Sequence, residues 1–170
     1  LSIRLGSALQ GPKSPWYYFF LEYLLKQAIE LSKKSVAIGG YPAGALVFHD
    51  GKIIATGFSD GKQLCDATSH AEISAIREAS KKLNKRDLTD VVLYTSLEPC
   101  VMCLAASFWA HIPKIVFACR RKSVSSKYYE GEHDIFELNK TSRRQIELIH
   151  FKELESDAMC VIQDWENRPQ

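Results

Sequence analysis

The sequence predicts an α/β fold in which helices cover both faces of a mixed β-sheet, a three-layer α/β/α arrangement. Three observations lead to this prediction. Apolar residues recur at helical spacing in four stretches, short apolar runs lie between these stretches, and an Asp-Gly pair joins the first two runs. A hairpin followed by alternating helices and strands gives a sheet with both antiparallel and parallel neighbours.

The order of elements follows from local signals along the chain. Ser14-Pro15 is typical of a helix start, because proline suits the first helical position and serine suits the cap. Asp50-Gly51 between two apolar runs predicts a hairpin. Residues 120–144 lack periodicity and are expected to form a long polar loop. The expected elements are a helix at 15–34, strands at 45–48 and 53–58, a helix at 70–83, a strand at 91–95, a helix at 100–111, strands at 115–119 and 146–151, and a closing helix at 154–165.

The composition is that of an ordinary globular domain. The chain has 170 residues, 46% apolar and 25% charged, and its formal net charge of +2 is too small to indicate nucleic-acid binding by itself. The longest apolar run is far shorter than a membrane span. Five cysteines, of which only two lie close together, favour a reducing compartment over a disulfide framework. We therefore expect a cytoplasmic protein without a membrane partner, with a flexible arm at residues 1–15 and a single domain at 16–170.

Two short motifs, His70-x-Glu72 and Pro99-Cys100-x-x-Cys103, contain the residues with the most distinctive chemistry. Residues three apart share one face of a helix, and the proline restricts the cysteines to the first helical turn, where the helix dipole stabilises thiolates. Residues two apart do not share a face, so the histidine and the glutamate can serve one metal only if the histidine lies at the extreme helix start.

The sequence permits this geometry, because Thr68 and Ser69 are natural helix caps and directly precede His70. Histidine and two cysteines then supply three ligands for one Zn²⁺ and leave the fourth corner open, as in catalytic zinc sites. Two thiolates and a neutral imidazole cancel the metal charge, so bound water would have a pKa near 7. Glu72 would accept that proton. Hydroxide would attack the carbon of an amidine-like C(–NH₂)=N unit, Glu72 would protonate the ring nitrogen, and ammonia would leave.

Other interpretations of the cysteines remain. A structural zinc site would take Cys65 as its fourth ligand, but a closed site would give Glu72 no function. A redox pair would explain Cys-x-x-Cys, but not the His-x-Glu motif thirty residues upstream.

The two motifs resemble the signature of the cytidine and deoxycytidylate deaminase superfamily, His-x-Glu followed by Pro-Cys-x-x-Cys. The likeness covers residues 41–119. Within it, residues 95–103 are most similar to the purine-side members, the bacterial tRNA adenosine deaminases and the guanine deaminases. The resemblance implies a cytidine-deaminase-like fold with a five-stranded sheet, and usually a homodimer. It also implies that His70, Cys100 and Cys103 bind the zinc and that Glu72 is the catalytic proton shuttle.

The same resemblance assigns Ala43, Ser59 and Trp109 to substrate binding. Residues 41–45 are similar to the strand entry that lines the base pocket in these enzymes, and residues 107–110 are closer to the guanine deaminase version. The family commonly has asparagine eleven residues before the zinc histidine. Here that position is Ser59, which offers one hydroxyl instead of an amide and leaves the substrate open.

We therefore expect a zinc-dependent hydrolytic deaminase of a nucleobase or nucleoside, with a purine such as guanine preferred. The alternatives are a tRNA adenosine deaminase, a cytosine or cytidine deaminase and, outside enzymes, a non-catalytic zinc-stabilised subunit that binds a partner. The basic residues at 120–122 and Lys127 are typical either of phosphate contacts or of a solvated loop. The acidic pair around Trp165 argues against an RNA partner. Residues 128–134 form either part of a pocket lid or dimer contact, or a tyrosine-rich surface turn.

Overall fold

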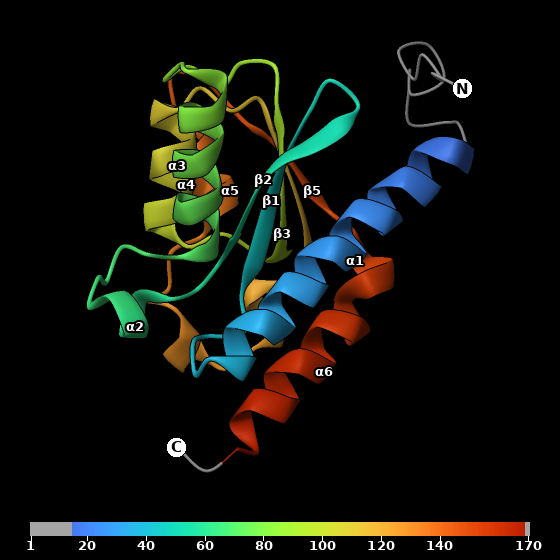
Figure 1. Cartoon of the computed structure of the whole chain (residues 1–170), viewed down its shortest axis with the longest axis vertical. Helices are drawn as coiled ribbons and strands as arrows, with labels where there is room; N and C mark the ends of the chain where they lie inside the picture. Colours follow the sequence, from blue (N-terminus) through green and yellow to red (C-terminus); the bar gives the residue numbers. More distant parts are fainter. Residues whose placement is uncertain (1–14, 169–170) are drawn as a thin grey trace.

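A five-stranded mixed sheet forms the middle layer of the computed structural model, which describes residues 15–168 (Figure 1). The strand order is β2-β1-β3-β4-β5. The strands are β1 (Gly44–His49), β2 (Lys52–Phe58), β3 (Val92–Leu97), β4 (Lys114–Cys119) and β5 (Glu147–His150). β1 is antiparallel to both of its neighbours, whereas β3, β4 and β5 run parallel. The predicted mixed sheet is confirmed. Ser14 and nearly all of the expected arm lie outside the described residues.

Helices cover both faces of this sheet, as predicted. α1 (Pro15–Ala37) and α6 (Glu155–Glu166) pack on one face, and α3 (Ala71–Leu83), α4 (Val101–Trp109) and α5 (Ile135–Lys140) lie on the other (Figure 1). Each face has its own apolar core, because each sheet surface must be buried against amphipathic helices. None of the described helices combines the length and the apolar character that a membrane crossing requires.

The hairpin between β1 and β2 forms at the predicted turn. Asp50 and Gly51 have φ angles of 46° and 77°, the left-handed conformation that a two-residue hairpin turn needs at both central positions. The strands pair from His49 with Lys52 to Gly44 with Phe58, with one irregularity after Val47.

One edge of the sheet gathers the segments that carry the predicted site. β1 begins there and β2 ends there, since Gly44 pairs with Phe58. The parallel strands β3 and β4 end at the same edge, where Leu97 pairs with Cys119. In α/β sheets, the carboxyl ends of parallel strands are the usual place for a ligand site. The residues that follow β2, β3 and β4 therefore meet beside the entry to β1.

Two segments contain helices where the sequence predicts loops. The expected loop at 59–69 includes the one-turn helix α2 (Gly61–Leu64), and the expected loop at 120–144 includes α5. Both helices are too short for apolar periodicity to reveal them. The start of α5 does have a capping residue, Asp134. Its carboxylate accepts hydrogen bonds from the backbone N–H groups of Phe136 at 2.8 Å and Glu137 at 3.3 Å.

Candidate functional site

The first turns of α3 and α4 bring the three candidate metal ligands together. His70 is the N-cap residue of α3 and Cys100 is the N-cap residue of α4, and both have extended backbone angles. The Nδ1 atom of His70 lies 3.6 Å from the Sγ atom of Cys100 and 3.6 Å from that of Cys103. Because His70 precedes the regular helix, its side chain and that of Glu72 line the same cavity although the two residues are only two apart.

These separations fit one tetrahedral zinc ion. With Zn–S of about 2.3 Å and Zn–N of about 2.0 Å, tetrahedral geometry places nitrogen and sulfur about 3.5 Å apart, close to the observed 3.6 Å. The ligand atoms of His70, Cys100 and Cys103 all lie within 4.8 Å of one another. Cys65 is exposed and does not belong to this group. The described residues therefore offer three ligands, the number found in catalytic zinc sites, and not the closed set of a structural site.

The hydroxyl groups before His70 do not cap α3, contrary to the sequence-based expectation. The Oγ atom of Ser69 donates to Asp60 at 2.5 Å, and the Oγ1 atom of Thr68 donates to Asp66 at 2.7 Å. His70 takes the cap position, and its side chain makes no capping hydrogen bond. The side chain at this helix start is thus directed to the other candidate ligands instead of to the backbone.

Protonation of the site is set by burial and by contacts among the ligands. The hydrogen bond from the Cys103 thiol, together with His70, lowers the pKa of Cys100 to about 4. The same contact with Cys100, together with burial, raises the pKa of Cys103. The cysteine pair therefore holds one thiolate at neutral pH, which is the form that binds zinc.

Glu72 is the one carboxylate in the first turn of α3, and only 5% of its surface is exposed. Burial, reinforced by the charge of Cys100, raises the pKa of Glu72 to about 7 in the metal-free site. A carboxyl group with a pKa near neutrality can both accept and release a proton during a reaction. The role of Glu72 as the proton shuttle stays a prediction.

His70, Glu72 and Cys100 line a cavity of about 260 Å³. Ala43, at the entry to β1, and Ser59, after β2, line the same cavity, so these two predicted residues lie beside the candidate metal ligands. Trp109 does not. It lies at the other end of α4, is 77% exposed and lines neither this cavity nor the one next to it.

The opposite wall of the cavity comes from the segment after β4. We call residues 120–131 the wall segment. Its side chains at the cavity are those of Arg121, Lys127, Tyr128, Tyr129 and Glu130. For residues 128–134 the sequence leaves open whether they form part of a pocket lid or dimer contact, or a tyrosine-rich surface turn, and the presence of Tyr128, Tyr129 and Glu130 at the cavity favours the pocket lid. A tyrosine-rich stretch after a strand is the only signal that pointed to it.

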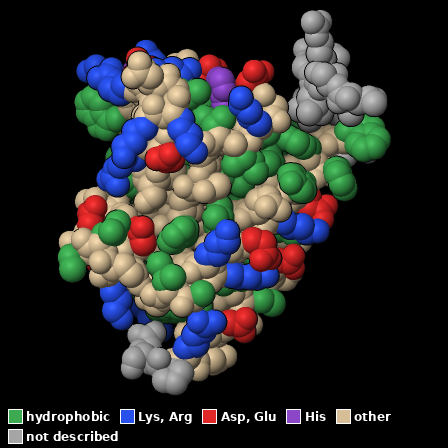
Figure 2. Space-filling view, viewed as in Figure 1, with side chains coloured by type: hydrophobic (Ala, Val, Ile, Leu, Met, Phe, Trp, Pro, Cys, Tyr) green, Lys and Arg blue, Asp and Glu red, His purple; other side chains and the backbone are tan. Residues whose placement is uncertain are grey.

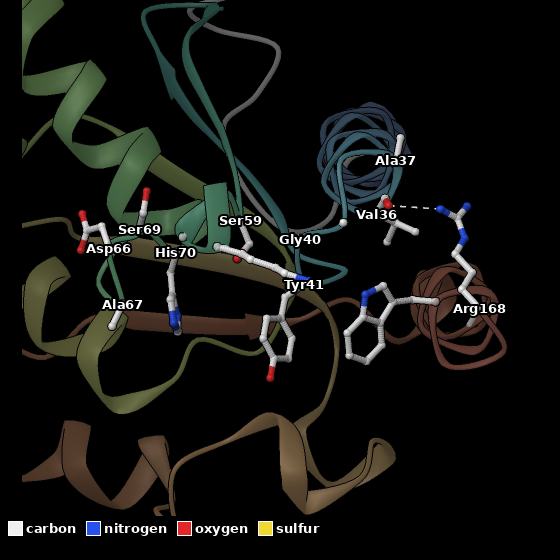
Figure 3. A pocket seen from close by; sticks show the side chains of 14 residues that line it. Val36, Ala37, Gly40, Tyr41, Ser59, Asp66, Ala67, Ser69, His70 and Arg168 are labelled. Atoms are coloured by element: carbon white, nitrogen blue, oxygen red, sulfur yellow. Dashed lines mark hydrogen bonds between the residues drawn. The ribbon is translucent and has the colours of Figure 1, made fainter. Parts of the chain in front are cut away.

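A second cavity, of about 570 Å³, adjoins the first and shares Tyr41, Ser59 and His70 with it. Figure 3 shows this outer cavity between α2 and the C-terminal ends of α1 and α6. The ring of Tyr41 stacks on that of Trp165, with centroids 5.2 Å apart. Arg168 borders the outer cavity and donates to the carbonyl of Val36 at 3.1 Å (Figure 3).

Comparisons with known proteins agree with this geometry. Residues 20–119 match the family model described as the cytidine and deoxycytidylate deaminase zinc-binding region. Guanine deaminase from Bacillus subtilis is 33% identical over 147 residues, which are 86% of this chain and 94% of that protein. A tRNA-specific adenosine deaminase from Aquifex aeolicus is 39% identical over 101 residues, 59% of this chain and 67% of that protein. A solved structure of an NE0047 variant in complex with 8-azaguanine has a TM-score of 0.79 at 28% identity, covering 87% of this chain and 86% of that one.

Proposed function

Because this chain belongs to the cytidine and deoxycytidylate deaminase family of zinc-dependent hydrolases, we propose that it removes the exocyclic amino group of a purine base, with guanine as the first candidate. Family membership accounts for the class of reaction and for the metal. The proposal concerns the substrate and the work of individual residues. The homodimer and the cytoplasmic location expected from the sequence stay predictions.

One observation supports guanine over the other substrates. The similarity to guanine deaminase spans 147 residues, so it cannot be confined to the first 119 and extends past the zinc-binding region. The similarities to tRNA-specific adenosine deaminases are shorter, 101 residues for the Aquifex aeolicus protein and 123 for one from Buchnera aphidicola. The wall segment, which faces the candidate metal site across the cavity, lies in the part after residue 119.

The roles of the zinc-site residues follow from their placement. A zinc ion held by His70, Cys100 and Cys103 would lower the pKa of water from about 15.7 toward about 7 and so supply the nucleophile. Glu72 would accept the proton that the water loses and would transfer it to the ring nitrogen beside the attacked carbon. The proton of the new hydroxyl would then move to the amino nitrogen, the oxygen would form the new carbonyl, the carbon–nitrogen bond would break, and the amino group would leave as ammonia.

The cavity suits a single base. Its volume of about 260 Å³ lies just below the range for ligand sites that take drug-sized molecules, about 300–1,000 Å³. Ser59, which is 7% exposed, would offer the base a hydroxyl that can donate or accept. Ala43 would present a small apolar surface at the entry to β1. Both residues border the cavity together with the side chains of the wall segment.

A tRNA adenosine deaminase is the second candidate, and the outer cavity is what favours it. The outer cavity shares lining residues with the inner one, so nucleotides that flank a bound base could lie in it. Lys62 and Arg168 border the outer cavity and would supply positive charge for their phosphates. Asp66 borders it as well. On the face that Figure 2 shows, Lys and Arg side chains lie among Asp and Glu side chains.

An ammonia-release screen tests the proposal. Guanine, adenine, cytosine, their nucleosides and tRNA are each incubated with the protein, and zinc content is measured on the same sample. We expect release from guanine at the highest kcat/KM. Faster release from tRNA, with RNA binding that weakens steeply as salt rises, would assign the second function instead. A zinc-loaded sample that releases ammonia from none of these substrates would reject both.

A further inference from the structure

Glu98, between β3 and the cysteines, directs its polar groups to the last residue of β4 and to the segment that follows it. Its backbone N–H donates to the carbonyl of Cys119 at 2.7 Å, and its own carbonyl accepts from the hydroxyl of Tyr129 at 2.7 Å. Its carboxylate accepts from the backbone N–H of Arg121 at 3.2 Å. Only 4% of Glu98 is exposed, so these contacts are made away from water. Burying a carboxylate costs free energy unless the charge is paired and hydrogen-bonded. Glu98 therefore depends on these partners to stay buried.

The carboxylate of Glu98 also pairs with the guanidinium of Arg120. The Nε atom of Arg120 lies 2.8 Å from Oε2 of Glu98, although among the described residues this nitrogen finds no acceptor with hydrogen-bond geometry. The Arg120 guanidinium lies above the ring of Phe136, 4.5 Å from its centroid, in a cation–π contact. Charge attraction to the carboxylate and the contact with the aromatic ring thus both hold Arg120 in place.

Glu98 therefore connects two walls of one cavity. Toward the C-terminus it is followed by Pro99 and the ligand Cys100, and both line the cavity. Through its hydrogen bonds it holds Arg121 and Tyr129, which line the cavity on the other side.

We propose that Glu98 is a positioning residue that fixes the wall segment against the cysteine-bearing turn, and thereby keeps the side chains of the wall segment in place around the bound base. This rests on the function proposed above, because it assumes that the base lies in the cavity. Glu98 does not transfer protons and does not bind the metal. Its loss should therefore weaken substrate binding and leave zinc in place.

Two variants separate its two interactions. Glu98→Gln keeps an oxygen for the N–H of Arg121 and loses the charge that faces Arg120, whereas Glu98→Ala loses both. Glu147→Gln is the matched control. Glu147 pairs with Lys114 at 2.8 Å where β4 and β5 begin, at the opposite end of these strands from the cavity. The control thus removes one carboxylate charge from an ion pair of the same length without touching the wall.

Kinetics and zinc content test the proposal in the zinc-loaded protein. We expect Glu98→Ala to raise KM about tenfold, with kcat within about threefold of wild type and one zinc still bound per chain. Glu98→Gln should have a KM between those of wild type and Glu98→Ala. Glu147→Gln should have the KM and kcat of wild type. An unchanged KM in a folded Glu98→Ala protein would overturn the proposal. Loss of zinc in step with activity would also overturn it, because it would place the effect on the cysteine turn itself.

Amide hydrogen exchange gives a second test that needs no substrate. In the substrate-free protein, Glu98→Gln should speed exchange in residues 120–131, where an acceptor has lost its charge, and leave exchange in α1 unchanged. Equal exchange of the wall segment in wild type and Glu98→Gln would overturn the proposal even if no deaminase activity were found. If wild type releases no ammonia but exchange changes as expected, the proposed substrate is wrong and the positioning role stands. If Glu98→Ala does not fold, hydrogen exchange in Glu98→Gln still tests the positioning role.

Discussion

Replacing Glu72 with glutamine removes proton transfer from the candidate site while keeping its shape. The amide has nearly the volume of the carboxylate, so the ligands and the cavity around it should stay in place. Glutamine cannot take a proton from water or give one to a ring nitrogen. We therefore expect Glu72→Gln to bind one zinc per chain and to lose nearly all ammonia release.

The size of the loss follows from the two transfers assigned to Glu72. A positioned general acid–base group contributes about 10²–10⁴-fold to a rate. Glu72 would both receive the proton and deliver it, and it is buried where water cannot easily substitute. The loss should therefore lie at the upper end, about 10³–10⁴-fold in kcat, or about 4–5.5 kcal/mol in activation free energy.

The same substitution should stabilise the metal-free protein above neutral pH. Burial raises the pKa of Glu72 from 4.5 to about 7, so the folded state keeps a proton that the unfolded chain releases. The stability provided by this proton is complete below pH 4.5 and is lost as pH rises through 7. That difference corresponds to roughly 3 kcal/mol. Metal-free Glu72→Gln should therefore unfold at higher urea than metal-free wild type at pH 8, and at a similar concentration near pH 4.5.

Ammonia release, zinc content and urea unfolding are measured on wild type, Glu72→Gln and a control, Glu78→Gln. Glu78 lies on the same helix, and its partly exposed side chain pairs with Lys82 at 3.5 Å. The control should behave as wild type in all three measurements. If Glu72→Gln kept more than a tenth of the wild-type kcat with its zinc bound, the assignment of Glu72 as the proton shuttle would be wrong.

Three further predictions concern the metal, the packing and the base. Chelation should abolish ammonia release and lower the melting temperature, and added zinc should restore both in wild type but not in His70→Ala. Activity that survives complete metal removal would contradict the proposed zinc site. Gly57→Ala should cost about 3 kcal/mol in urea unfolding, because a Cβ there would lie 2.1 Å from the carbonyl oxygen of Ala71 at the start of α3, and an unchanged midpoint would contradict this packing. Ser59→Ala should raise KM about fivefold at constant kcat, as expected for one lost hydrogen bond to the base; an unchanged KM would remove Ser59 from the substrate site.

Much of the fold and the zinc-site geometry could be predicted because local rules determine them. Asp50-Gly51 fixes the hairpin through backbone conformation alone. His70 and Glu72 are two residues apart, so they can both reach one metal ion only if His70 lies at the helix start. The structure places His70 there, as the N-cap residue of α3. Pro99 likewise allows the cysteines only in the first turn of α4.

The remaining features depend on contacts between distant segments. The wall segment lines the cavity because Glu98, more than twenty residues earlier, binds it, and no local pattern encodes that pairing. Thr68 and Ser69 have the composition of caps, but Asp60 and Asp66 compete for their hydroxyls. Trp109 was assigned by similarity of a short stretch, and the length of α4 carries it away from the cavity.

X-ray absorption at the zinc edge tests the central claim most directly. On the purified wild-type protein, we expect one zinc per chain with two sulfur ligands at about 2.3 Å and two lighter ligands at about 2.0 Å, one from His70 and one from solvent. Cys65→Ser should leave this spectrum unchanged. A shell of three or four sulfur atoms, or a protein that takes up no zinc at all, would contradict the account.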